Sequence, residues 1–329
     1  MNPFEYVNPR TVNSAVAEVA DKGCFLAGGI DVLGEMKEYI AQPRRLVNVK
    51  ELPGLDQIVP AHGARAHMQA SDVWTIGANV TVAAIENHEE LKRAFPGLQQ
   101  AAAEVGSLQI RNVATVGGNL AQHSRCWYYR HRDIRCLKKG GATCYARDGE
   151  NKYHSLFSGN PCISPVVSNL AIALAALDAK VIVRRGKEDV TLTIPEFYAK
   201  AWDNPQAHHS LASTDLILRV EIPNAGRKSA YLQISEKASF DWALVSCAAA
   251  AKVDGRKLSQ VRIVLGSVSP VPHQIPAANE LLDGKELDDA LASRAADAIL
   301  KDAAPFAHNG YKVPIAHALV RRTLKQLLV

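Results

Sequence analysis

The stretch from Gly106 to Ala179 constrains this chain most, because it sets a glycine-rich turn directly before a cysteine-rich loop. The turn contains Gly117-Gly118, and an apolar run follows the loop at residues 170–177. Four of the chain's six cysteines lie in between. A turn suited to phosphate next to a group of thiols suggests two cofactor sites, with the rest of the chain as their scaffold.

Length and charge set the broad class of the protein. At 329 residues the chain is long enough for two or three domains. Its net charge of +5 is mild, and no Lys/Arg stripe with interleaved aromatic residues predicts nucleic-acid binding. No apolar run reaches the roughly eighteen residues of a membrane span. The first residues lack a signal-peptide pattern, so we expect a cytoplasmic protein, or a periplasmic one exported together with a signal-bearing partner.

Hydrophobic periodicity predicts a small βαβ unit in residues 1–57, followed by a larger unit in residues 58–223. The first unit is expected to have helices at 11–22 and 31–40 and strands at 24–27 and 46–49. The second is expected to have a long helical region at 82–105 and strands at 73–78, 180–185, 190–194 and 216–222. The turn that begins at Pro223 predicts a boundary to a last domain, residues 224–329. There we expect two strands, 243–253 and 260–267, paired through the turn Asp254-Gly255, and helices at 287–300 and 315–328.

A Gly-Gly turn also joins the predicted strand at 24–27 to the following helix. Two glycines let consecutive backbone amides converge on an anion, and the helix adds its positive end. The candidate residues are Leu26, Ala27, Gly28, Gly29, Ile30, Asp31, Val32 and Leu33. A helix cap at Asp31 is the competing interpretation. Neither G-x-G-x-x-G nor G-x-x-x-x-G-K-[ST] occurs, which argues against an ordinary Rossmann or P-loop site.

The second Gly-Gly turn repeats this arrangement with a hydroxyl before it and an amide after it. Its candidate residues are Thr115, Val116, Gly117, Gly118 and Asn119. Two such turns fit a pyrophosphate held from both sides. The alternative is two tight turns without a ligand.

The four loop cysteines have nine, seven and seventeen residues between them: Cys126, Cys136, Cys144 and Cys162. Zinc sites usually contain a closely spaced C-x₂₋₄-C pair, which is missing here. Iron–sulfur clusters also need thiolates but accept looser spacing. Spacing therefore favours iron–sulfur and leaves zinc, free thiols and disulfides open. The nearby histidines His123, His131 and His154 form no H-x-x-x-H pair, and we interpret them as solvated or packing residues.

Taken in order, several segments resemble the FAD-binding (medium) subunit of xanthine dehydrogenase-type molybdenum hydroxylases. The resemblance covers essentially the whole chain and is carried by residues 26–31, 109–120, 175–179, 216–223, 237–244 and 266–272. The cysteine loop, residues 123–163, is similar to an insertion in the flavin subunits of 4-hydroxybenzoyl-CoA reductase and periplasmic aldehyde oxidoreductase. In those subunits it binds an extra [4Fe–4S] cluster.

The resemblance implies an α+β fold, with a two-part FAD-binding region of the vanillyl-alcohol-oxidase (PCMH) type at 1–223. A C-terminal domain of antiparallel sheet and helices would follow at 224–329. Leu26–Leu33 and Thr115–Asn119 would hold FAD, with Asn169 near the flavin chain and Ile217 or Leu218 near the isoalloxazine ring. Three departures concern flavin tuning: Ile30 replaces a usual Thr or Ser, Asn169 replaces a usual Asp, and no lysine stands near Gln233-Ile234.

The resemblance also implies function. Cys126, Cys136, Cys144 and Cys162 would hold [4Fe–4S], and no side chain need act as a catalytic acid or base. The chain would pass electrons through FAD between [2Fe–2S] clusters of a small subunit and an external acceptor or donor. A molybdopterin-binding large subunit would complete a heterotrimer or a dimer of heterotrimers. The alternatives are a stand-alone FAD-dependent oxidase and a zinc-stapled nucleotide-binding scaffold protein.

Overall fold

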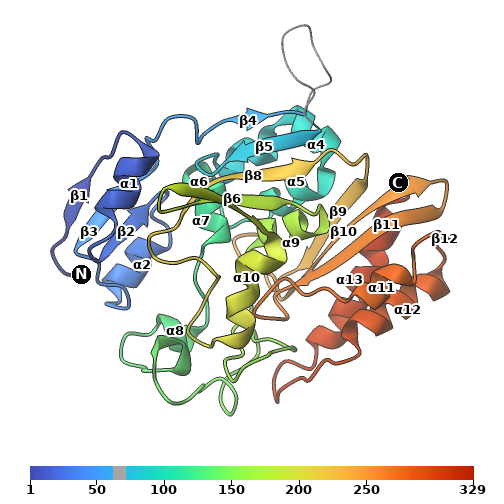
Figure 1. Ribbon diagram of the computed structural model, residues 1–329. Coiled ribbons are helices and arrows are strands. Elements are labelled where there is room, and N and C mark those ends of the chain that lie inside the picture. Colours follow the sequence, from blue (N-terminus) through green and yellow to red (C-terminus); the bar gives the residue numbers. More distant parts are fainter. Residues whose placement is uncertain (62–71) are drawn as a thin grey trace, which may run out of the picture.

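The computed structural model describes residues 1–61 and 72–329, and it contains three sheets surrounded by helices (Figure 1). The N-terminal sheet is parallel and three-stranded, in the order β1-β3-β2. Its elements are β1 (Glu5–Val7), α1 (Val12–Glu18), β2 (Gly23–Leu26), α2 (Val32–Lys37) and β3 (Arg45–Asn48). The two expected strands are present, and β1 is a third strand that the sequence pattern did not predict.

The second sheet has five antiparallel strands in the order β4-β5-β8-β6-β7. These are β4 (Ile58–Val59), β5 (Val73–Gly77), β6 (Lys180–Arg185), β7 (Glu188–Thr193) and β8 (Leu216–Pro223). The helices of this unit are α3 (Val82–Asn87), α4 (Glu89–Ala94), α5 (Pro96–Ala103), α6 (Leu108–Val113), α7 (Val116–Leu120), α9 (Asn169–Ala176) and α10 (Ile194–Asp203). The long helix expected at 82–105 is three helices, because His88 leaves helical conformation and Pro96 disfavours helical geometry at Phe95.

The third sheet is antiparallel, in the order β12-β11-β10-β9, and carries helices on one side. Its elements are β9 (Lys228–Ile234), β10 (Val245–Asp254), β11 (Lys257–Gly266), α11 (Pro276–Glu280), β12 (Lys285–Glu286), α12 (Asp289–Leu300) and α13 (Lys312–Gln326). The predicted pair β10 and β11 is joined at Asp254-Gly255, as expected. Strand β9 was not predicted. These elements confirm the α+β class with a C-terminal sheet-and-helix unit.

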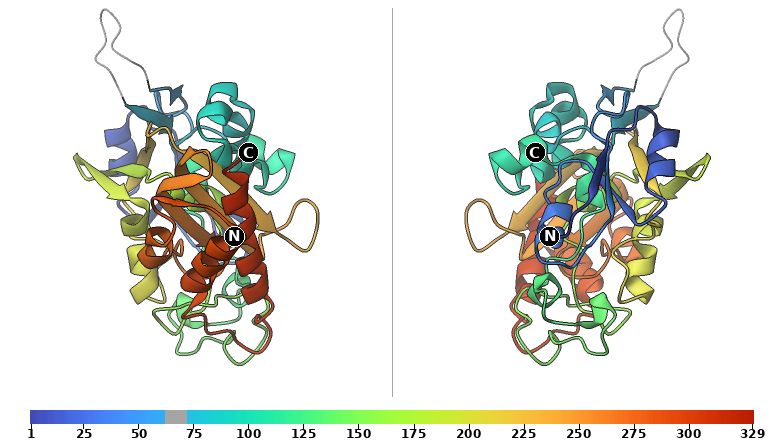
Figure 2. Two further views of the ribbon diagram at one scale, coloured as in Figure 1. Left: turned by 90° about the vertical axis from the view of Figure 1, so that its right-hand side faces the viewer. Right: turned by 90° about the vertical axis from the view of Figure 1, so that its left-hand side faces the viewer.

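The cysteine loop is mostly irregular, with only α8 (Trp127–Arg130) and a 3-10 turn at Leu137–Lys139. It lies at one end of the molecule beside the C-terminal helices (Figures 1 and 2). Asn309 donates hydrogen bonds to the carbonyls of His154 and Ser155, and Lys312 Nζ donates to that of Tyr153. The C-terminal unit therefore anchors this loop. Within the described ranges, no helix has both the length and the apolar character that crossing a membrane requires.

Candidate functional site

A cavity of about 370 Å³ is lined by residues of the small parallel sheet and of the larger unit beside it. Its walls come from the end of β2, the start of α2, helix α7, the segment 209–217 and Trp242. Ten predicted residues line it: Ala27, Gly28, Gly29, Ile30, Asp31, Val32, Thr115, Gly117, Gly118 and Asn119. The fold thus brings the two glycine motifs, far apart in sequence, to one cavity.

The first glycine turn presents free backbone donors to this cavity. Gly29 has a φ of +72°, which favours glycine. The backbone N–H groups of Gly28 through Val32 donate to no group in the described part of the chain, and all five residues line the cavity. A run of unpartnered amides along one wall is an arrangement that binds an anion.

The second glycine motif differs from the first, because its amides already have partners. It forms the start of α7, where Thr115 Oγ1 accepts from the N–H of Gly118 at 3.1 Å. The N–H of Gly117 donates to the Ala78 carbonyl at 2.9 Å. Asn119 Oδ1 accepts from Ser168 Oγ at 2.6 Å, and its Nδ2 donates to no described residue. This motif therefore offers a side-chain donor and space at the cavity wall.

Five predicted residues do not line the cavity: Leu26, Leu33, Val116, Asn169 and Leu218. Leu218 is only 5% exposed and packs in a core cluster with Val47. Its neighbours Leu216 and Ile217 line the cavity instead. Asn169 Nδ2 donates to Gln233 Oε1 at 3.1 Å. Of the two residues expected near the ring, Ile217 lines the cavity and Leu218 does not.

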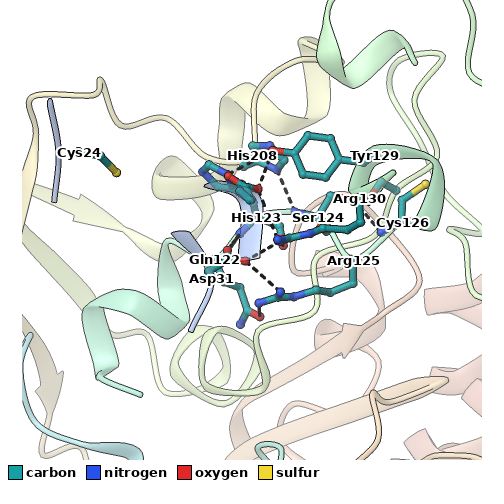
Figure 3. Close-up of polar contacts among 12 residues, drawn as sticks. Cys24, Asp31, Gln122, His123, Ser124, Arg125, Cys126, Tyr129, Arg130 and His208 are labelled. Atoms are coloured by element: carbon teal, nitrogen blue, oxygen red, sulfur yellow. Dashed lines mark hydrogen bonds and ion pairs between the residues drawn. The ribbon is translucent and has the colours of Figure 1, made fainter. Parts of the chain in front are cut away.

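Asp31 has a role that neither sequence interpretation anticipated. It occupies the N-cap position of α2, yet its side chain makes no capping hydrogen bond. Instead its carboxylate accepts from Arg125 Nη1 at 2.9 Å, Arg130 Nη2 at 2.6 Å and the backbone N–H of His123 at 2.6 Å (Figure 3). Burial opposes ionisation of Asp31, but the two guanidinium groups and this hydrogen bond keep the pKa of its carboxyl below the usual value.

One turn further along α2, Glu35 extends the same contacts. Its carboxylate accepts from Tyr129 Oη at 2.8 Å and lies 3.0 Å from His123 Nδ1. One ligand atom from each of Asp31, Glu35 and His123 lies within 4.8 Å of the other two, which is close enough for a metal ion. Because Arg125 and Arg130 already neutralise these carboxylates, we interpret the group as an ion-pair cluster. Sequence reasoning missed it, since its members are widely separated in the chain.

The four predicted cysteines line one small cavity, and all are free thiols: Cys126, Cys136, Cys144 and Cys162. Among described residues, the single group of three ligand atoms within 4.8 Å of one another is Asp31, Glu35 and His123. No three of the four cysteine sulfurs therefore lie within that distance of one another. Two thiolates bound at about 2.3 Å to one zinc ion can be no more than about 4.6 Å apart. The arrangement does not fit a single zinc ion.

Donors around the sulfurs suit thiolates. The backbone N–H groups of Tyr128 and Tyr129 act to lower the pKa of Cys126, and that of Ser164 acts to lower the pKa of Cys162. A hydrogen bond from Cys162 lowers the pKa of Cys144 to about 6, whereas burial raises that of Cys126 to about 11. Hydrogen bonds to cysteine sulfur are a feature of iron–sulfur sites.

Two further groups near the sulfurs were not predicted from the sequence. His154 Nε2 lies 3.1 Å from Cys126 Sγ, and burial lowers the pKa of His154 to about 4, so the ring is neutral. Burial also lowers the pKa of Lys138, against the opposing effect of the four cysteines around it. Position inside the cysteine loop was the only sequence signal for either residue.

Comparisons with known proteins agree with this geometry. Residues 2–225 match the FAD-binding domain in molybdopterin dehydrogenase, and residues 229–327 match the C-terminal domain of the CO dehydrogenase flavoprotein. The aldehyde oxidoreductase FAD-binding subunit PaoB of Escherichia coli is 32% identical over 99% of this chain and 96% of its own. The carbon monoxide dehydrogenase medium chain of Hydrogenophaga pseudoflava is 23% identical over 98% of this chain and 96% of its own.

Solved structures share the fold. A chain of reconstituted CO dehydrogenase from Oligotropha carboxidovorans superposes with a TM-score of 0.76 at 21% identity, covering 100% of this chain and 99% of that one. The family match and the cavity built from both glycine motifs point to the same conclusion. The chain belongs to the family of FAD-binding subunits of molybdopterin dehydrogenases and is an oxidoreductase flavoprotein component.

Proposed function

We propose that this chain passes electrons through FAD between [2Fe–2S] clusters of a partner subunit and an external acceptor or donor. The run of free N–H groups from Gly28 to Val32 carries the cofactor assignment. These donors would bind the pyrophosphate, Asn119 Nδ2 would supply a further donor, and Ile217 would pack near the ring. FAD supplies the redox chemistry when bound, while the chain holds and orients it. No side chain is assigned as a catalytic acid or base.

The partners follow from the names of the relatives. Several are a medium chain or subunit, such as the medium subunit of nicotine 6-hydroxylase from Paenarthrobacter nicotinovorans. We propose a molybdopterin-binding large subunit and a [2Fe–2S] small subunit, in a heterotrimer or a dimer of heterotrimers. The compartment stays a prediction: the cytoplasm, or the periplasm after co-export with a signal-bearing partner.

For the cysteine cavity we propose a [4Fe–4S] cluster held by Cys126, Cys136, Cys144 and Cys162. Three points support it: the cysteines share one cavity, no three of their sulfurs lie close enough together for one zinc ion, and nearby backbone N–H groups act to lower their pKa values. The rival is the zinc-stapled scaffold protein.

Cofactor analysis of the purified protein tests both assignments. We expect flavin absorption bands with a broad iron–sulfur shoulder, and bound iron that Cys136→Ser removes without necessarily removing FAD. A colourless protein with stoichiometric zinc would contradict the proposal.

Copurification with molybdenum and small iron–sulfur subunits distinguishes the complex from a stand-alone FAD-dependent oxidase, and a fully active isolated chain would favour the oxidase.

A further inference from the structure

A group of buried and partly buried polar side chains connects the FAD cavity to the cysteine cavity. We call it the Asp31 cluster, and its members are Asp31, Glu35, His123, Arg125, Tyr129 and Arg130; all but Glu35 are labelled in Figure 3. The two acids come from the start of α2, and the other four residues come from the N-terminal part of the cysteine loop and α8. Glu35 is 3% exposed and Tyr129 is 5% exposed, so neither could lose its partners to water without rearrangement.

At one end, the Asp31 cluster is continuous with the anion-binding turn. Asp31 belongs to the run of free amides from Gly28 to Val32. At the other end it is continuous with the cysteine site. Arg125 directly precedes Cys126, which is the N-cap of α8, and Tyr129 lines the cysteine cavity. A displacement of α8 would therefore move Arg130 and Tyr129 away from α2.

Arg125 also connects the cysteine loop to the cavity wall. Its side chain lines the FAD cavity, and its guanidinium carbon lies 4.8 Å from the ring centroid of Trp242. Trp242 lines the same cavity. The position of the residue before Cys126 thus helps to shape the cavity, although Cys126 itself lies in the other one.

We propose that Asp31 is a positioning residue that couples the two sites, so that iron in the cysteine site and FAD in the large cavity strengthen each other's binding. This inference rests on the proposed cofactors. Both sites require the same placement of α8 against α2. Breaking the contacts would leave buried charges unpaired, which is strongly unfavourable. Thermodynamic linkage makes the effect reciprocal: the factor by which iron tightens FAD equals the factor by which FAD tightens iron.

The test measures FAD affinity in the full-length protein with and without iron. Iron is removed by chelation under reducing conditions, and the FAD dissociation constant is measured from flavin fluorescence. For the wild type we expect FAD to bind at least about fivefold more tightly with iron. The quantity compared is the ratio of the FAD dissociation constant without iron to that with iron. In Asp31→Asn this ratio should fall close to one, whatever the absolute affinity for FAD. In Asp189→Asn, which removes a similar ion pair with Arg184 on the β6–β7 hairpin, the ratio should stay at the wild-type value.

The outcomes separate this inference from the proposed function. A wild-type protein that binds iron and FAD with a ratio near one overturns the coupling alone, as does an unchanged ratio in Asp31→Asn. A wild-type protein that binds no iron overturns both the cluster and the coupling. If Asp31→Asn fails to fold, Arg130→Gln takes its place, because Arg130 does not line the FAD cavity. A wild-type ratio in that variant would overturn the coupling equally.

Discussion

At the scale of single residues, Gly28 has two roles that both require a residue without a side chain. It belongs to the anion-binding turn, and it packs closely against the backbone of a neighbouring segment. A Cβ at this position would lie 2.4 Å from the Val113 carbonyl oxygen. Gly28→Ala should therefore cost about 1–3 kcal/mol of unfolding free energy and reduce bound FAD. Gly34→Ala is the control, since that Cβ would meet no atom within 4 Å and α2 would gain helix propensity. Urea unfolding and flavin stoichiometry check both, and equal stability of the two variants would contradict the prediction.

His154 offers a second test at this scale. Its neutral ring can donate from Nε2 to Cys126 Sγ, and this would withdraw electron density from the sulfur. His154→Phe should therefore make the reduction potential of the proposed cluster more negative. A redox titration followed by EPR measures the potential. His131→Phe in the same loop is the control, because His131 is exposed and its ring accepts from the Asp133 backbone N–H and not from a cysteine. Equal potentials in both variants would refute the role of His154.

At the scale of elements, the start of α13 holds the cysteine loop through a buried ammonium group. Lys312 is fully buried and donates to the carbonyls of Tyr153 at 3.0 Å and Ser267 at 2.8 Å. Burial lowers its pKa to about 7. Between this value and the higher pKa of the unfolded chain, the unfolded state binds more protons. Stability should consequently rise with pH in this window, by up to about 1.4 kcal/mol per pH unit from this one group.

Lys312→Met should remove this pH dependence. The check compares unfolding free energies of both proteins from pH 7 upwards, and parallel pH profiles would show that the lysine is not responsible. Lys285→Met, at an exposed position in β12, should keep the wild-type profile.

At the scale of elements, the strands and the contacts between them show which features could be predicted from the sequence. Periodicity found the strands β2, β3, β5, β6, β7, β8, β10 and β11, because their apolar residues follow local rules. It missed β1 and β9, and also the two-residue strands β4 and β12. It also could not reveal that Asp31 meets Arg125 and Arg130, because their distance is set by packing between elements. Likewise, the motif at Thr115 could be recognised from its two glycines. The sequence could not show that the backbone N–H groups of both glycines donate hydrogen bonds within the protein.

At the scale of the whole molecule, the two regions matched by separate family models both contribute to one hydrophobic core cluster, while a second cluster lies mostly in the C-terminal region. Helix α9, buried along its whole length, packs in this core with Tyr231, Ala248 and Val264 of the C-terminal sheet. Gly97 of α5 approaches β9 so closely that a Cβ would lie 2.9 Å from the Ala230 nitrogen. Asp178 pairs with Arg227 and Arg262, each at 2.9 Å. One core cluster therefore extends across the predicted boundary at Pro223.

This shared core predicts cooperative unfolding. A fragment of residues 1–225 would expose one side of α5 and α9 to water, so we expect it to aggregate or to lack a cooperative transition. In the complete chain, hydrogen exchange should protect β5 and β10 to a similar degree, because neither can open while the other stays packed. A soluble 1–225 fragment that binds FAD and unfolds cooperatively would show instead that the FAD-binding region folds alone. The C-terminal unit would then serve the cysteine loop, which it anchors through Asn309 and Lys312.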